Sequence, residues 1–99
     1  MPNENYTIVN NEKEMQFEIL QDGEKAYLTY RYYRKDLAFM HTSVPTPLAG
    51  KGIAGSLAKA AFEYAEKLQR QVIVFCPFVA KFITTHTEYK KQLDPEYYR

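Results

Sequence analysis

The chain has 99 residues, which is enough for one domain with one hydrophobic core. Apolar residues make up 45% and charged residues 25%, as in soluble globular proteins and unlike disordered chains. Lys and Arg number 13 against 12 Asp and Glu, so the formal net charge is +1. This balance argues against nucleic acid or an anionic membrane as the partner, because proteins that bind polyanions usually carry a clear basic excess.

Cysteine and histidine are scarce. The single cysteine, Cys76, excludes an intrachain disulfide and a cysteine-based zinc cluster, and the 2 histidines are too few to define a metal site. No apolar run approaches the roughly 20 residues of a membrane span, and the polar start does not resemble a signal peptide. We therefore expect a cytoplasmic protein, organised as one domain over residues 1–99, that is a monomer or a weak dimer.

The first half of the chain is predicted to form a three-stranded antiparallel meander. Apolar and polar residues alternate over 15–19 and again over 26–32, which is the period of half-buried strands. Asp22-Gly23 between them is typical of a tight hairpin turn. A third run, 37–44, is apolar on both faces, as central strands are. We also allow for a short strand at residues 6–9 before the meander.

The second half changes to helical spacing. A loop at 45–52 precedes a helix predicted over Ile53 to Arg70, since apolar residues recur there on one stripe. The stripe consists of Ile53, Leu57, Ala60, Ala61, Tyr64 and Leu68. A short buried strand at Val72 to Cys76 follows, then a short helix beginning near Pro77, and the tail is expected to add one further helical turn. The expected fold is α+β in the order β-β-β-α-β-α, with one βαβ crossover and the long helix packed on the sheet.

The loop before the long helix has the composition of an anion-binding site. Gly50, Gly52 and Gly55 allow backbone to approach a ligand closely, and a helix start presents unpaired N–H groups and a partial positive charge. Lys51 adds a positive side chain. The spacing matches neither a Walker loop nor the dinucleotide-binding fingerprint. A phosphate or diphosphate ligand fits this segment, and the alternative is a glycine-rich connector that only turns the chain.

These residues resemble motif A of the GNAT superfamily of acetyl-CoA-dependent N-acyltransferases. Gly52-Ile53-Ala54 matches the Gly-x-Ala part of the motif, and Gly50-Lys51 fills its variable positions. Ala49 departs from the usual Gln or Arg, a side chain that helps to order the diphosphate loop. Over residues 6–90 the chain is similar to the minimal YjdJ-type members of the superfamily. The shared features are His-Thr-x-Val-Pro, here residues 41–45, and a cysteine after the helix, here Cys76.

The resemblance implies a reduced GNAT fold whose two parallel strands splay apart to admit the pantetheine arm of acetyl-CoA. It implies cofactor binding by Val44, Gly50, Lys51, Gly52, Ile53, Ala54, Gly55 and Lys81. Larger members have additional N-terminal helices that shape the acceptor site. We expect this chain to lack them, so the acceptor site is expected to be open or completed by a partner, and the acceptor amine is not identified.

Two side chains are candidates for the chemistry. Cys76 precedes Pro77 at the expected start of the second helix, where a thiolate is stabilised, so it is a candidate nucleophile or acid. The alternative is a small buried apolar residue. His41 falls on the face of Leu37 and Phe39 by simple alternation and is a candidate base, or an ordinary strand histidine. His86 is interpreted as an exposed tail residue.

Three functions are consistent with these patterns. The first is a minimal N-acetyltransferase that moves acetyl from acetyl-CoA to an amine, with a backbone N–H near Val44 polarising the thioester. The second is an acyl-CoA-binding or sensing module without an acceptor site. The third is a domain that binds another phosphorylated ligand, or a structural protein.

Overall fold

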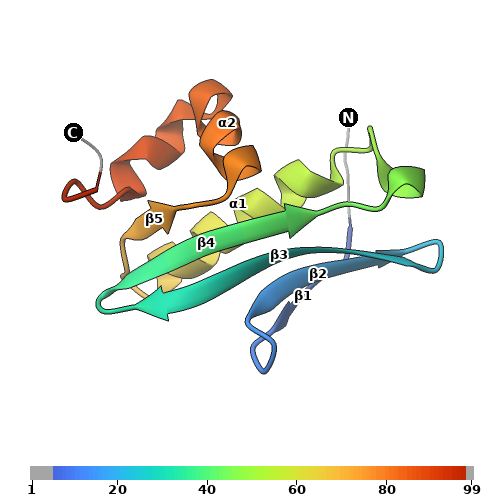
Figure 1. Cartoon of the computed structure of the whole chain (residues 1–99), viewed down its shortest axis with the longest axis horizontal. Helices are drawn as coiled ribbons and strands as arrows, with labels where there is room; N and C mark the ends of the chain where they lie inside the picture. Colours follow the sequence, from blue (N-terminus) through green and yellow to red (C-terminus); the bar gives the residue numbers. More distant parts are fainter. Residues whose placement is uncertain (1–5, 98–99) are drawn as a thin grey trace.

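Five strands form one mixed sheet in the order β1-β2-β3-β4-β5 (Figure 1). The computed structural model describes residues 6–97. The strands are β1 (Ile8–Asn11), β2 (Gln16–Gln21), β3 (Glu24–Tyr33), β4 (Asp36–Ser43) and β5 (Val72–Val74). Neighbours from β1 to β4 pair antiparallel, and β5 pairs parallel with β4. The predicted meander is confirmed, and the short preceding strand lies at residues 8–11 instead of 6–9.

Two α-helices accompany the sheet: α1 (Ile53–Lys67) and α2 (Pro77–Thr85). Short 3₁₀ helices occupy Thr46–Leu48 and Thr87–Gln92, and the latter is the helical turn predicted for the tail. Helix α1 ends before the predicted Arg70, because Gln69 adopts a left-handed conformation with φ 58°. Across residues 6–97, none of the helices has the length and apolar character that crossing a bilayer requires.

The hydrophobic core lies between α1 and one face of the sheet. On α1 the fully covered residues are Ile53, Leu57, Ala58, Ala61, Phe62 and Ala65. This stripe is rotated from the predicted one, because the tail also packs on α1: the rings of Phe62 and Tyr89 stack at 4.7 Å, and Gln92 Nε2 donates to the Phe62 carbonyl. Leu68, predicted to be in the stripe, is 37% exposed. The tail therefore widens the buried side of the helix toward Phe62.

A β-bulge interrupts the pairing of β3 with β4. Tyr30 pairs with Phe39, but the preceding residue Thr29 pairs with His41, which leaves Met40 as the extra residue of β4. An extra residue reverses the alternation of side chains beyond it. The two ends of β4 therefore present opposite sets of residues to the core.

The bulge moves His41 to the face of the sheet away from α1. Paired residues in an antiparallel ladder share a face, so His41 lies with Thr29, and its ring is 6.3 Å from that of Tyr27. Thr42, which pairs with buried Leu28, lies on the core side instead. The prediction that His41 shares the face of Leu37 and Phe39 is wrong, because uninterrupted alternation does not hold across a bulge.

Candidate functional site

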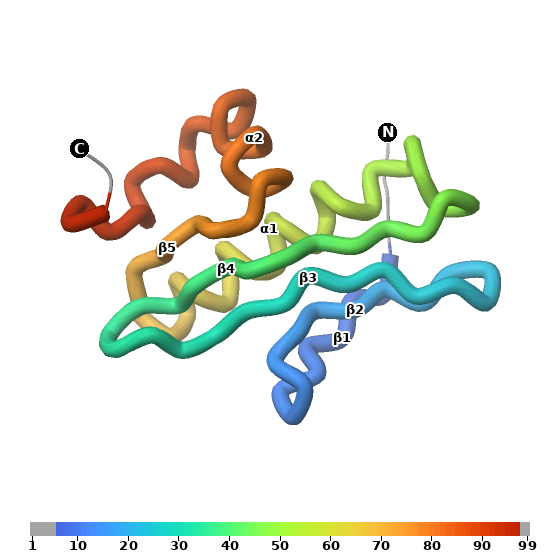
Figure 2. Tube along the Cα trace, viewed as in Figure 1, coloured from blue at the N-terminus to red at the C-terminus, as the bar shows by residue number. Residues whose placement is uncertain are grey.

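Strands β4 and β5 separate just beyond their short paired region. The pairing covers Leu37 to Phe39 of β4, and then the N–H groups of Phe75 and Cys76 both donate to the Phe39 carbonyl, at 2.9 and 3.0 Å. From there β4 continues to Ser43, whereas the segment that follows β5 turns away into α2 (Figure 2). The predicted strand at 72–76 consequently ends at Val74. The splayed pair expected from the resemblance is present.

Backbone N–H groups line up at the start of α1. Gly50 and Gly52 adopt left-handed φ values of 78° and 74°, and the first helical hydrogen bond runs from Ser56 N to the Gly52 carbonyl. For residues 50–55, no hydrogen-bond partner of a backbone N–H occurs within the described part of the chain. No side chain caps the helix either. These donors and the positive end of the helix dipole suit an anion.

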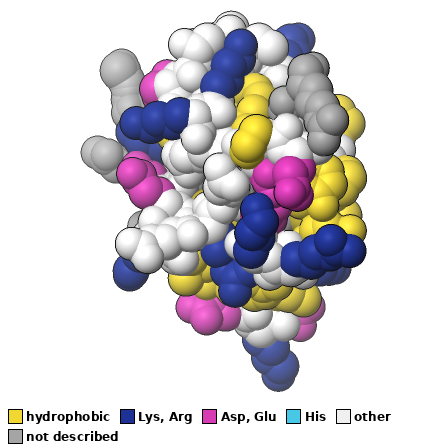
Figure 3. Space-filling model, turned by 90° about the vertical axis from the view of Figure 1, so that its left-hand side faces the viewer, with side chains coloured by type: hydrophobic (Ala, Val, Ile, Leu, Met, Phe, Trp, Pro, Cys, Tyr) yellow, Lys and Arg dark blue, Asp and Glu magenta, His cyan; other side chains and the backbone are white. Residues whose placement is uncertain are grey.

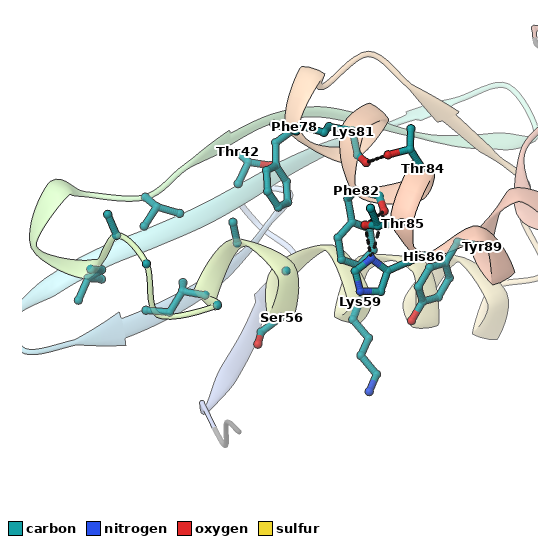
Figure 4. A pocket seen from close by; sticks show the side chains of 18 of the residues that line it. Thr42, Ser56, Lys59, Phe78, Lys81, Phe82, Thr84, Thr85, His86 and Tyr89 are labelled. Carbon is teal, nitrogen blue, oxygen red and sulfur yellow. Dashed lines mark hydrogen bonds between the residues drawn. The ribbon is translucent and has the colours of Figure 1, made fainter. Parts of the chain in front are cut away.

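A groove of about 1040 Å³ runs between this loop, the first turns of α1, and α2 (Figure 4). Most of the predicted cofactor residues line it: Val44, Gly50, Gly52, Ile53, Ala54, Gly55 and Lys81. Lys51, His41 and Cys76 are not among the lining residues. The fold therefore places the predicted loop and Lys81, which are distant in sequence, on the same groove. It leaves three predicted side chains outside this groove.

Lys51 is held at the edge of the loop by two other segments. Its ammonium Nζ lies 3.8 Å from a carboxylate oxygen of Asp22, in the β2–β3 turn. Its carbonyl oxygen accepts a hydrogen bond of 2.6 Å from the Tyr6 hydroxyl. Both side chains of the ion pair are largely exposed, at 46% and 66%, so water screens their attraction.

Cys76 lies behind the groove wall. It is the N-cap residue of α2, as predicted, and is 1% exposed. Its Sγ is 3.2 Å from the hydroxyl of Thr42, a residue that does line the groove. Thr42 therefore connects the buried thiol with the groove, and it is the bulge that turns this threonine of the His-Thr-x-Val-Pro pattern to the core side.

One wall of the groove is aromatic. Phe82 stacks on His86 with ring centroids 4.1 Å apart, and Phe78 and Tyr89 continue the wall (Figure 4). Burial, and secondarily the charge of Glu88, raises the pKa of Tyr89. His86 is exposed as predicted, but it also lines the groove. The spacing of four residues between Phe78, Phe82 and His86 is the signal that could have identified this wall.

Two lysines line the groove, one from each helix. Lys59 extends from α1 and Lys81 from α2, with Ser56 beside the helix start (Figure 4). Glu88 is the one acidic lining residue in the described part of the chain. A groove with an aromatic wall, free N–H groups and two ammonium groups fits a ligand that joins anionic and apolar parts.

Comparison with known proteins identifies the family. Residues 16–93 match the sequence profile of the GCN5-related N-acetyl-transferase family, and the chain belongs to this family. It is 31% identical over 91 residues to Protein NATD1 of Danio rerio, and the alignment covers 87% of this chain and 83% of that protein. For Protein NATD1 of Bos taurus the identity is 30% over 93 residues, covering 89% of this chain and 82% of the relative.

The fold gives the same assignment. A solution structure of a GCN5-like candidate N-acetyltransferase from Staphylococcus aureus superposes with a TM-score of 0.71 and 26% sequence identity. The match covers 93% of this chain and 91% of that one. The α+β fold and the resemblance to small single-domain GNAT proteins are therefore confirmed.

Proposed function

We propose that this protein binds acetyl-CoA in the groove and transfers its acetyl group to an amine. The observation that carries the proposal is the row of N–H groups over residues 50–55, without partners among the described residues, on a groove that leads to the separated strands. A diphosphate is the part of CoA that such donors suit. Lys81 lines the same groove, and Lys51 adds positive charge at the edge of the loop.

The remaining parts of the cofactor follow from this anchor. The pantetheine arm would run toward the opening beyond Phe39, where β4 and β5 have separated. A backbone N–H near Val44 would then polarise the thioester carbonyl, since a preorganised donor stabilises the oxyanion formed during acyl transfer. Val44 lines the groove just after the end of β4.

Two chemical routes are compatible with the proposal. In the direct route His41 takes a proton from the acceptor ammonium on the outer face of the sheet, the free amine attacks the acetyl carbonyl, and the CoA thiolate leaves. In the two-step route the Cys76 sulfur attacks, its proton passes to the departing CoA thiolate, and an amine then displaces the cysteine from the acetyl group. Thr42, 3.2 Å from the thiol, connects Cys76 with the groove in the second route.

A second candidate function is acyl-CoA binding without turnover. It is favoured by the burial of Cys76, which is 1% exposed, and by the position of His41 on the other face of the sheet. This candidate shares the ligand with the first and differs only in the absence of acetyl transfer.

Calorimetric titration with acetyl-CoA, followed by intact mass spectrometry and an assay with a panel of amines, tests the proposal. We expect binding, and we expect Gly52→Asp to abolish it, because the new carboxylate repels the diphosphate. Gly23→Asp is a matched control, since Gly23 has a similar φ of 77° in the β2–β3 turn and does not line the groove. Absence of binding at millimolar acetyl-CoA would refute the proposal, and binding without transfer to any amine would select the second candidate.

A further inference from the structure

One hydrogen bond joins the N-terminal segment to the loop over residues 45–52, where we place the diphosphate of the cofactor. The Tyr6 hydroxyl donates to the carbonyl oxygen of Lys51 at 2.6 Å, across 45 positions of sequence. The Tyr6 ring is half-buried and packs against the hydrophobic core, and this packing fixes the position of the hydroxyl. Among the described residues, no other side chain is hydrogen-bonded to the backbone of loop 45–52.

This bond determines the direction of a neighbouring donor. A trans peptide unit is planar, so its C=O and N–H groups point in opposite directions. Every peptide bond in the described chain is trans. Fixing the Lys51 carbonyl therefore fixes the N–H of Gly52, which lines the groove and has no partner within residues 6–97.

The loop needs such an anchor because its own residues are permissive. Gly50 and Gly52 flank Lys51, and glycine rotates between backbone conformations more freely than any other residue. Ala49, just before them, has no polar side chain that could order the loop. Without the phenol, no hydrogen bond from a described side chain would hold the peptide between Lys51 and Gly52.

We propose that Tyr6 is a positioning residue, whose hydroxyl preorganises the Gly52 N–H for a phosphate oxygen of the cofactor. The inference rests on the proposed function, because it assigns Tyr6 to the same anion site. The gain comes from preorganisation, since a donor already aimed at the ligand loses less freedom on binding. The nearby ion pair of Lys51 with Asp22 is 3.8 Å long with both side chains largely exposed, so it contributes little.

The test compares acetyl-CoA with S-acetylpantetheine, which lacks the diphosphate and the adenosine 3′-phosphate attached to it. Tyr6→Phe removes only the hydroxyl and keeps the packed ring. We expect it to weaken acetyl-CoA binding about two- to tenfold, the range of one hydrogen bond, and to leave binding of S-acetylpantetheine unchanged, because that ligand lacks the diphosphate. The amide resonance of Gly52 should also shift in the unliganded variant. Asp22→Asn, which removes the other contact to Lys51, is the matched control, with less than a twofold effect.

The outcomes separate this inference from the proposed function. An unchanged affinity for acetyl-CoA in Tyr6→Phe would overturn the role of Tyr6 while the CoA site stands. An equal loss for both ligands would also overturn it, because it would show a general structural effect. If the wild-type protein binds S-acetylpantetheine and acetyl-CoA equally well, the diphosphate site itself is wrong. If it binds neither, the proposed function fails.

Discussion

Two buried carboxyl groups at one end of the sheet make the stability of this protein depend on pH. Asp36 begins β4 and Asp94 lies in the tail, and they are 2% and 1% exposed. Asp94 accepts hydrogen bonds from Lys35 Nζ at 3.2 Å and from the N–H of Glu96 at 2.9 Å. Charged side chains of both signs crowd this end of the molecule (Figure 3). The two carboxyl groups interact in opposite senses, raising the pKa of Asp36 and lowering that of Asp94, so Asp36 is the one that keeps a proton below about pH 6.

The size of the effect follows from the pKa of Asp36. Burial, followed by the hydrogen bond with Asp94, raises this pKa from 3.8 to about 6, with Glu96 adding to the rise and Lys35 opposing it. The folded state therefore keeps a proton that the unfolded chain releases, and stability falls as pH rises from about 4 to about 6. A difference of about two pH units corresponds to at most about 3 kcal/mol. Because the neighbouring Lys35 side chain is 65% exposed, water screens the charges at this site, and we expect about 1–3 kcal/mol.

Asp94 acts in a different range of pH. The hydrogen bond from Asp36, and next the N–H of Glu96, lower the pKa of Asp94. The stabilisation from a lowered carboxyl pKa is present above about pH 4 and is lost in more acid solution. The fall between pH 4 and pH 6 therefore belongs to Asp36.

Urea unfolding of the wild type and of Asp36→Asn from pH 4 to pH 7.5 measures the effect. Asparagine still donates to Asp94 but does not titrate, and the other groups cancel in the difference between the two proteins. As pH rises, we expect the free energy of unfolding of the wild type to fall by about 1–3 kcal/mol relative to that of the variant. Asp22→Asn, at a carboxylate that is 66% exposed in the β2–β3 turn, is the control for replacing a carboxylate by an amide. A flat difference for Asp36→Asn would refute the reasoning.

Three further predictions concern the core and the chemistry. Phe62→Ala should lower the free energy of unfolding by about 3–5 kcal/mol, since Phe62 is fully buried between Phe39 and Tyr89; urea titration measures this, and a loss below about 1 kcal/mol would contradict the packing. Cys76→Ala should remove any acetyl adduct seen by mass spectrometry while acetyl-CoA still binds, and full acetyl transfer by this variant would leave the cysteine a packing role. His41→Ala should reduce acetyl transfer at least about 100-fold without changing the affinity for acetyl-CoA, and an unchanged rate would exclude His41 as the base.

The order of the elements and the nature of the loop were readable from local sequence. Alternating apolar residues, the Asp22-Gly23 turn and the helical stripe after Gly52 each depend on neighbours in the chain, so strands and helices were predicted in the right order. The glycine-rich loop was recognised for the same reason, because left-handed backbone conformations favour glycine. The family resemblance rested on this segment, on the His-Thr-x-Val-Pro pattern before it and on Cys76 after the helix.

Other features arise only when distant segments meet. The bulge at Met40 is a property of two paired strands, and it exchanges the faces of His41 and Thr42. The burial of Phe62 requires the tail to fold back over α1. The contact of Tyr6 with Lys51 joins residues 45 positions apart. Local patterns report the preferences of neighbouring residues, whereas strand register and long-range contacts are selected by the packing of the whole chain.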